Sequence, residues 1–110
     1  WYQEMVQEPN AAGWQETQEL IEEMHRTMEA RGGRFLVAIQ PLFVNLDGDY
    51  PFESVHRTVA EALRNRGVFV VDLLDDFRDM DAPALWVHPA DRHPNEFAHR
   101  MIAESIDDEL

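Results

Sequence analysis

The chain has 110 residues, which is enough for one domain with a single hydrophobic core and too few for two. Hydrophobic residues make up 45% of the sequence and charged residues 28%, a balance typical of folded globular proteins. Acidic residues outnumber basic residues 22 to 9, and the net charge of -13 repels nucleic-acid phosphates and anionic lipid headgroups. We therefore expect no nucleic-acid partner and no membrane-surface binding. The absence of Cys excludes disulfides, thiolate catalysis and Cys-ligated zinc.

The sequence offers no segment for insertion into a membrane. Its longest wholly apolar run, Phe35 to Ile39, is far shorter than the roughly 20 residues that a membrane-spanning helix needs. The first residues, Trp1 to Glu4, include no initiator Met and none of the basic and apolar regions of a signal peptide. We expect no membrane span, and we expect this chain to be part of a longer protein.

The first half of the chain predicts a helix followed by a strand. Apolar side chains recur at a helical period between residues 14 and 31, opposite an acidic face, and Gly32 and Gly33 should end this helix. The apolar run from Phe35 to Ile39 then lies between these glycines and Pro41. A continuous apolar run of this length predicts a strand covered on both faces, as in a parallel sheet.

The second half repeats this order. A loop from Pro41 to Pro51 leads to a second amphipathic helix over residues 52–66, and Gly67 precedes a second buried strand over residues 68–71. Alternating helices and strands indicate βαβ units, so we expect the two strands to be parallel neighbours in an α/β fold. A closing helix is predicted over residues 94–110, with Pro94 in its first turn.

Two parallel strands alone would leave both sheet edges open and bury little apolar surface. We therefore expect further strands to come from another part of the domain, or the chain to associate with itself through the sheet edge.

The residues suited to catalysis gather between the second strand and the closing helix. Three of the five histidines, His88, His93 and His99, lie in this segment together with Asp91. We expect a loop here, at the carboxyl end of the strands, where open α/β sheets bind ligands. Asp91 can accept the Nδ1 hydrogen of His93, fix the tautomer and leave Nε2 to act as a general base. We expect His99, on the closing helix, to have a structural role.

Two other interpretations of these residues are open. Asp91 could cap the closing helix beside an exposed His93. Alternatively, His88, Asp91 and His93 could bind a divalent metal ion, because imidazole and carboxylate groups suit zinc and similar ions.

The run Asp91-Arg92-His93-Pro94-Asn95, followed by Ala98-His99 and Ile102-Ala103, resembles the last conserved block of the SGNH/GDSL hydrolases. The two expected strands precede this block in the order that the family shows. Two positions depart from the family pattern. The commonest spacing places the Asp three residues before the His, where this chain has Ala90, and the usual Gly before the second His is Ala98.

The resemblance implies a three-layer α/β/α, flavodoxin-like fold with a parallel sheet, of which residues 1–110 are the carboxyl-terminal part. It also implies a Ser-His-Asp triad that hydrolyses a small-molecule or carbohydrate ester, with His93 as the general base and Asp91 as its orienting carboxylate. It implies no metal and no cofactor.

The family's Gly-Asp-Ser nucleophile motif is absent from this sequence, whose only serines are Ser54 and Ser105. We therefore expect the amino-terminal half of the domain to supply the nucleophile, and the chain alone to be inactive. Two alternatives are an O-acyltransferase of the same fold, in which a sugar hydroxyl accepts the acyl group, and a noncatalytic acidic interaction module.

Overall fold

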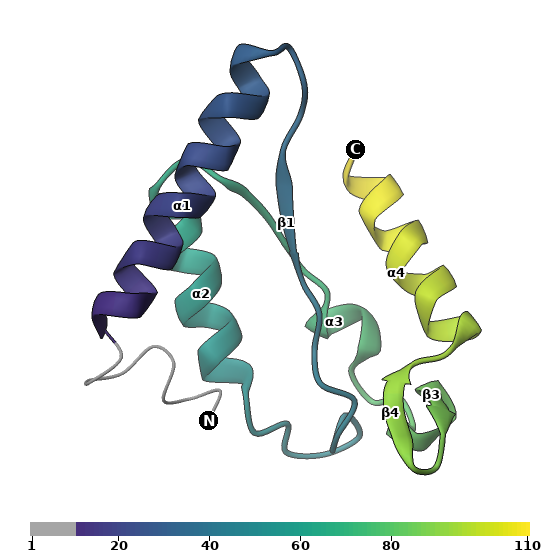
Figure 1. Cartoon of the computed structure of the whole chain (residues 1–110). Helices are drawn as coiled ribbons and strands as arrows, with labels where there is room; N and C mark the ends of the chain where they lie inside the picture. The colour runs from purple at the N-terminus through teal and green to yellow at the C-terminus, as the bar shows by residue number, and fades with distance from the viewer. Residues whose placement is uncertain (1–10) are drawn as a thin grey trace. The chain divides into compact units, whose positions relative to one another are not determined.

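The computed structural model describes residues 11–110, which form a mixed α/β fold (Figure 1). In chain order the elements are α1 (Ala11–Ala30), β1 (Leu36–Ile39), α2 (Glu53–Asn65), β2 (Phe69–Asp72), α3 (Leu74–Phe77), the 3-10 helix η2 (Ala82–Leu85), β3 (Trp86–His88), β4 (Asp91–Pro94) and α4 (Glu96–Glu109). Among these helices none has both the length and the apolar character needed to cross a bilayer.

Strands β1 and β2 form a parallel pair, and α2 connects them. The predicted parallel pairing is thus confirmed, with each strand within one residue of its expected start. The backbone N–H of Leu73 donates to the carbonyl of Ile39 at 3.0 Å and continues the pairing past the end of β2.

The strands are less covered than their apolar sequences predict. Strand β1 is half-buried, with Ala38 exposed, and Phe69 of β2 is 45% exposed. The expectation of a strand covered on both faces is therefore wrong for β1. In β2 it fails at Phe69 and holds at Val70 and Val71, which are 5% and 8% exposed and point to opposite faces. Two short strands offer little area against which a helix can pack.

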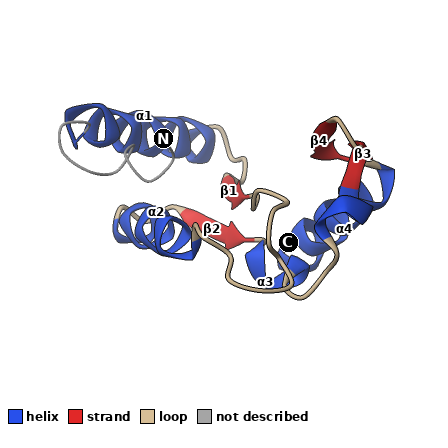
Figure 2. Ribbon diagram, turned by 90° about the horizontal axis from the view of Figure 1, so that it is seen from below, coloured by secondary structure: helices blue, strands red, loops and turns tan. Residues whose placement is uncertain are grey.

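The chain divides into two compact units, and the division falls within β1 and β2. Of the described residues, the first unit contains 11–37 and Phe52–Val71. Helices α1 and α2 lie side by side in it (Figures 1 and 2). Arg66, directly after α2, joins them by donating to Oε1 of Gln18 at 3.2 Å and to Oε2 of Glu22 at 2.7 Å.

Both long helices of the first unit end where the glycines predict. Gly32 after α1 and Gly67 after α2 have φ angles of 77° and 81°, a left-handed conformation that glycine adopts without steric cost. Their N–H groups donate to the carbonyls of Glu29 and Arg64, each at 2.9 Å. These bonds satisfy carbonyl groups that the helix itself leaves without partners.

The second unit contains Ala38–Pro51 and Asp72–Leu110. Its core is apolar, and the rings of Phe43 and Phe77 meet there with their centroids 5.0 Å apart. The other large core residues of this unit include Leu46, Leu73, Leu74 and Leu85, all at most 3% exposed. The core therefore connects the segment that follows β1 with α3 and η2.

The segment expected to be a loop is a β-hairpin, shown in red beside α4 in Figure 2. Strands β3 and β4 pair in antiparallel register, with Trp86 opposite Pro94 and His88 opposite Asp91, and an irregularity lies between these two pairs. Pro94 belongs to β4, and α4 begins two residues later. The predictions of a loop here and of a helix starting at Pro94 are both wrong, because Asn95 is extended and caps the helix.

Candidate catalytic site

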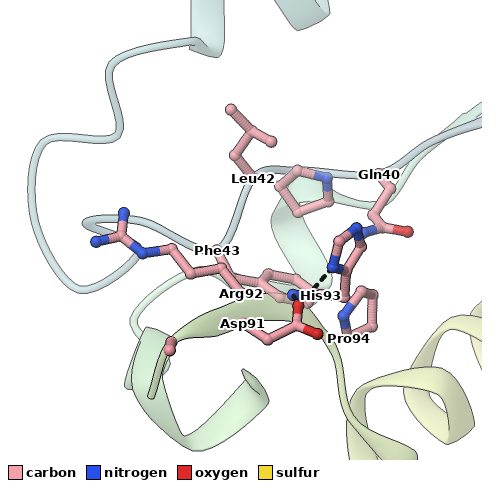
Figure 3. A pocket seen from close by; sticks show the side chains of 9 residues that line it. Gln40, Leu42, Phe43, Asp91, Arg92, His93 and Pro94 are labelled. Carbon is pink, nitrogen blue, oxygen red and sulfur yellow. Dashed lines mark hydrogen bonds and ion pairs between the residues drawn. The ribbon is translucent and has the colours of Figure 1, made fainter. Parts of the chain in front are cut away.

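Strand β4 places Asp91 and His93 on the same side of the hairpin, because side chains two residues apart in a strand point the same way. The backbone N–H of His93 donates to Oδ1 of Asp91 at 3.0 Å. The same oxygen lies 2.5 Å from His93 Nδ1, the contact dashed in Figure 3. The contact expected between these two side chains is therefore present.

The second ring nitrogen of His93 is left open. Nε2 makes no hydrogen bond to any residue between 11 and 110, and the side chain is 83% exposed. A carboxylate beside Nδ1 favours the tautomer that carries its hydrogen there, so the lone pair is on Nε2. This is the arrangement that a general base requires.

The backbone holds Asp91 in its ionised form. The pKa of Asp91 is lowered from its ordinary value of 3.8, first by the backbone N–H of His93 and then by the hydrogen bond to the His93 ring. The positive charges of His93 and His88 add smaller effects in the same direction. Asp91 is thus a carboxylate at every pH at which the His93 ring is neutral and can act as a base.

We expect Asp91 to stay ionised at pH values below 3.8, as measured by the ¹³C shift of its carboxyl carbon in an NMR titration. Because the pKa is lower in the folded chain than in the unfolded chain, the interaction stabilises the fold above pH 3.8 and is lost as the pH falls through the folded value. His93→Ala removes the ring but keeps the backbone N–H of residue 93. In this variant the pKa of Asp91 should therefore rise toward 3.8 without reaching it. A wild-type value at or above 3.8 would contradict this account.

A groove of about 340 Å³ lies beside the pair. One wall is the segment Gln40–Phe43, which follows the carboxyl end of β1, and the other is Ala90–Pro94. Gln40 and His93 both line this groove, and Figure 3 draws their side chains. The pair therefore lies beside the carboxyl end of a parallel strand, where ligands bind in open α/β sheets.

Two hydrogen bonds hold the wall formed by residues 40–43. The hydroxyl of Tyr50 accepts from the backbone N–H of Leu42 at 3.0 Å. The indole Nε1 of Trp86 donates to the carbonyl of Phe43, also at 3.0 Å. Burial raises the pKa of Tyr50, with a smaller contribution from the charge of Asp72, so this hydroxyl stays protonated at neutral pH.

Asn95 joins the hairpin to α4, a role that the sequence analysis did not assign. Its Oδ1 accepts from the N–H of Ala98 at 2.9 Å and caps the helix. Its Nδ2 donates to the carbonyls of Ala84 at 2.8 Å and Trp86 at 3.3 Å. An Asn directly before a helix is a recognisable capping signal. The alternative in which Asp91 caps the helix is wrong, because Asn95 does so.

The remaining histidines of the segment lie outside the Asp91–His93 pair. The ring of His88 accepts a hydrogen bond at Nδ1 from the N–H of Ala90, at 3.0 Å, and His99 is exposed on α4. Within residues 11–110 no three His, Asp or Glu side chains are arranged to hold a metal ion. The metal site considered for His88, Asp91 and His93 therefore has no support from the described residues.

No serine of the second unit lines the groove. Ser54 is on α2 in the first unit, and Ser105 is on α4, about 14 Å along the helix from its first residue. The second unit thus brings together the Asp91 carboxylate and the His93 imidazole, and no serine of this unit is among the residues that line the groove.

Comparison with known proteins adds no relative: no family model, no curated protein and no solved structure matches this chain.

Proposed function

We propose that the chain provides the general base and the orienting carboxylate of a serine ester hydrolase of the SGNH type. The observation that carries this proposal is the contact between Asp91 Oδ1 and His93 Nδ1, 2.5 Å long, with Nε2 left open. The Asp-x-His-Pro-Asn block and the β1–α2–β2 order, typical of a three-layer α/β/α fold, support the same family.

The departure from the family's commonest spacing fits this role. The block has its Asp two residues before the His, and strand geometry puts residues at this spacing on one face. The hairpin therefore allows Asp91 to bond His93 through both the backbone N–H and the ring. One carboxylate oxygen orients the imidazole and also fixes the backbone that carries it.

In the proposed reaction, a serine hydroxyl gives its proton to Nε2 of His93 while its oxygen attacks the ester carbonyl. The imidazolium, stabilised by Asp91, then returns this proton to the leaving alcohol as the carbon–oxygen bond breaks. Water enters next, loses a proton to His93 and attacks the acyl carbon. The bond from this carbon to the serine oxygen then breaks, His93 gives its proton to that oxygen, and the acid is released. The serine and the oxyanion-hole donors would come from a part of the complete protein outside these residues.

A fluorophosphonate probe tests this function on the complete protein, because it forms a covalent bond only with an activated serine. We expect labelling that falls sharply in His93→Ala and that persists in Ser54→Ala and Ser105→Ala. Mass spectrometry of the labelled peptide would identify the nucleophile. Loss of labelling in either serine variant would show that the nucleophile lies within this chain. A protein with no labelling at all would favour the noncatalytic interaction module.

A further inference from the structure

Arg92 is the fixed positive charge of the groove. It lies between Asp91 and His93 on β4 and is among the residues that line the groove. Its guanidinium carbon lies 4.9 Å from the centroid of the Trp86 ring. Trp86 is itself held by its hydrogen bond to Phe43. A cation over an aromatic face is attracted by the ring, so the position of this side chain is restricted.

Arg92 differs from several other arginines of this acid-rich chain. Arg66, Arg78 and Arg100 each form an ion pair with a Glu or Asp. Arg92 forms no ion pair with any residue of the described part of the chain, although acidic residues number 22. Its neighbour Asp91 is bonded to His93. The positive charge at the groove is therefore not neutralised by a carboxylate of residues 11–110.

The charge and the base occupy different parts of the groove. In Figure 3 the side chain of Arg92 extends away from the His93 imidazole. The wall beside them consists largely of the apolar residues Pro41, Leu42 and Phe43. A guanidinium over an indole ring still has N–H groups directed away from the ring, and two of them can form parallel bonds to a carboxylate.

We propose that the groove binds esters that carry an anionic group, a carboxylate, at a distance from the scissile bond, and that Arg92 binds this group. The inference rests on the ester hydrolase function proposed above and names its class of substrate. The apolar wall would contact the carbon chain between the ester and the anion. In a chain with net charge -13, such a cation is needed to hold an anionic substrate at one place.

Three nitrophenyl esters test this on the complete protein: nitrophenyl hexanoate, nitrophenyl hydrogen adipate, and the hexanoate ester of carboxynitrophenol. The first is neutral, the second carries a carboxylate on the acyl chain, and the third carries it on the leaving alcohol. We expect Arg92→Gln to lower kcat/KM for one charged ester relative to the neutral ester by roughly three- to tenfold, mainly through KM. Comparing each ratio with the wild-type ratio cancels the intrinsic reactivity of the esters.

Arg100→Gln is the matched control, because it also removes one positive charge but lies on α4 outside the groove. It should leave the ratios as in the wild type, and Arg92→Lys should recover part of the lost preference. The inference would be overturned if Arg92→Gln left the kcat/KM of both charged esters, relative to the neutral ester, unchanged. It would also be overturned if Arg100→Gln lowered these ratios as much as Arg92→Gln does.

A binding measurement separates the inference from the function on which it rests. Calorimetric titration of the His93→Ala variant with the same esters measures, without turnover, how much more tightly a charged ester binds than the neutral one. This difference in affinity should disappear in the double variant that also carries Arg92→Gln. If His93→Ala abolishes hydrolysis and the charge preference is absent, the hydrolase function stands and the substrate class is wrong. If His93→Ala hydrolyses the esters like the wild type, the proposed function itself is wrong.

Discussion

In the proposed hydrolase, His93→Ala is expected to lower kcat for ester hydrolysis by about 10⁴-fold, because His93 is the only histidine among the described residues that line the groove. The fold should be unaffected, since the His93 side chain is 83% exposed and contributes little to packing. Initial rates with a neutral nitrophenyl ester measure the first effect. The midpoint of thermal unfolding measures the second, and it should remain close to the wild-type value.

His99→Ala is the control for this experiment, because His99 is also exposed but lies on α4 away from the groove. It should retain wild-type turnover. Asp91→Asn should be impaired as well, since an amide can donate to Nδ1 and favour the tautomer that lacks a free Nε2 lone pair. Wild-type turnover by His93→Ala would refute the assignment of the base.

Asn95→Ala is expected to lower the free energy of unfolding by about 2–3 kcal/mol, measured by urea denaturation. The substitution removes the cap of α4, which typically contributes about 1 kcal/mol. It also leaves the carbonyls of Ala84 and Trp86 without their side-chain donor, and each lost bond costs about 1 kcal/mol. The hairpin that carries Asp91 and His93 should loosen, so turnover by the proposed hydrolase should fall as well.

Asn95→Asp separates the two contributions. A carboxylate can still accept from the N–H of Ala98 and cap the helix, but it cannot donate to the carbonyls of Ala84 and Trp86. If it destabilises the fold as much as Asn95→Ala does, the two donated bonds carry the effect. If the free energy of unfolding of Asn95→Ala lies within about 0.5 kcal/mol of the wild-type value, Asn95 does not hold the hairpin as described.

The elements that the sequence predicted well are those with a strong local signal. The helices α1 and α2 have a clear apolar period, and a glycine, which is suited to positive φ, lies two residues after the last residue of each. Strand β1 and the first three residues of β2 are apolar runs, and α2 between the strands predicts their parallel pairing. The Asp91–His93 contact follows from two-residue spacing, which brings the side chains together in a strand as well as in a tight loop.

The hairpin could not be predicted in this way. Its strands have three and four residues, and they contain polar residues and Pro94 rather than alternating apolar ones. The hairpin is supported by side-chain hydrogen bonds outside its strand pairing. Asn95 donates to the carbonyls of Ala84, before β3, and of Trp86, within β3. Trp86 donates to the carbonyl of Phe43, which is distant in sequence. The partners of these bonds lie 9 to 43 residues apart, so no local pattern records them.

The side chains that shape the groove bond mainly to main-chain atoms. Tyr50 contacts the N–H of Leu42, and Trp86 contacts the carbonyl of Phe43. A backbone group has the same donor or acceptor whichever side chain it carries, proline aside. Leu42 is half-buried, whereas Phe43 packs in the core. The side chain at position 42 can therefore change, altering the groove's shape and polarity, while the wall it belongs to stays in place. A substitution at this position would thus alter which ligands fit the groove without changing the hairpin or the Asp91–His93 pair.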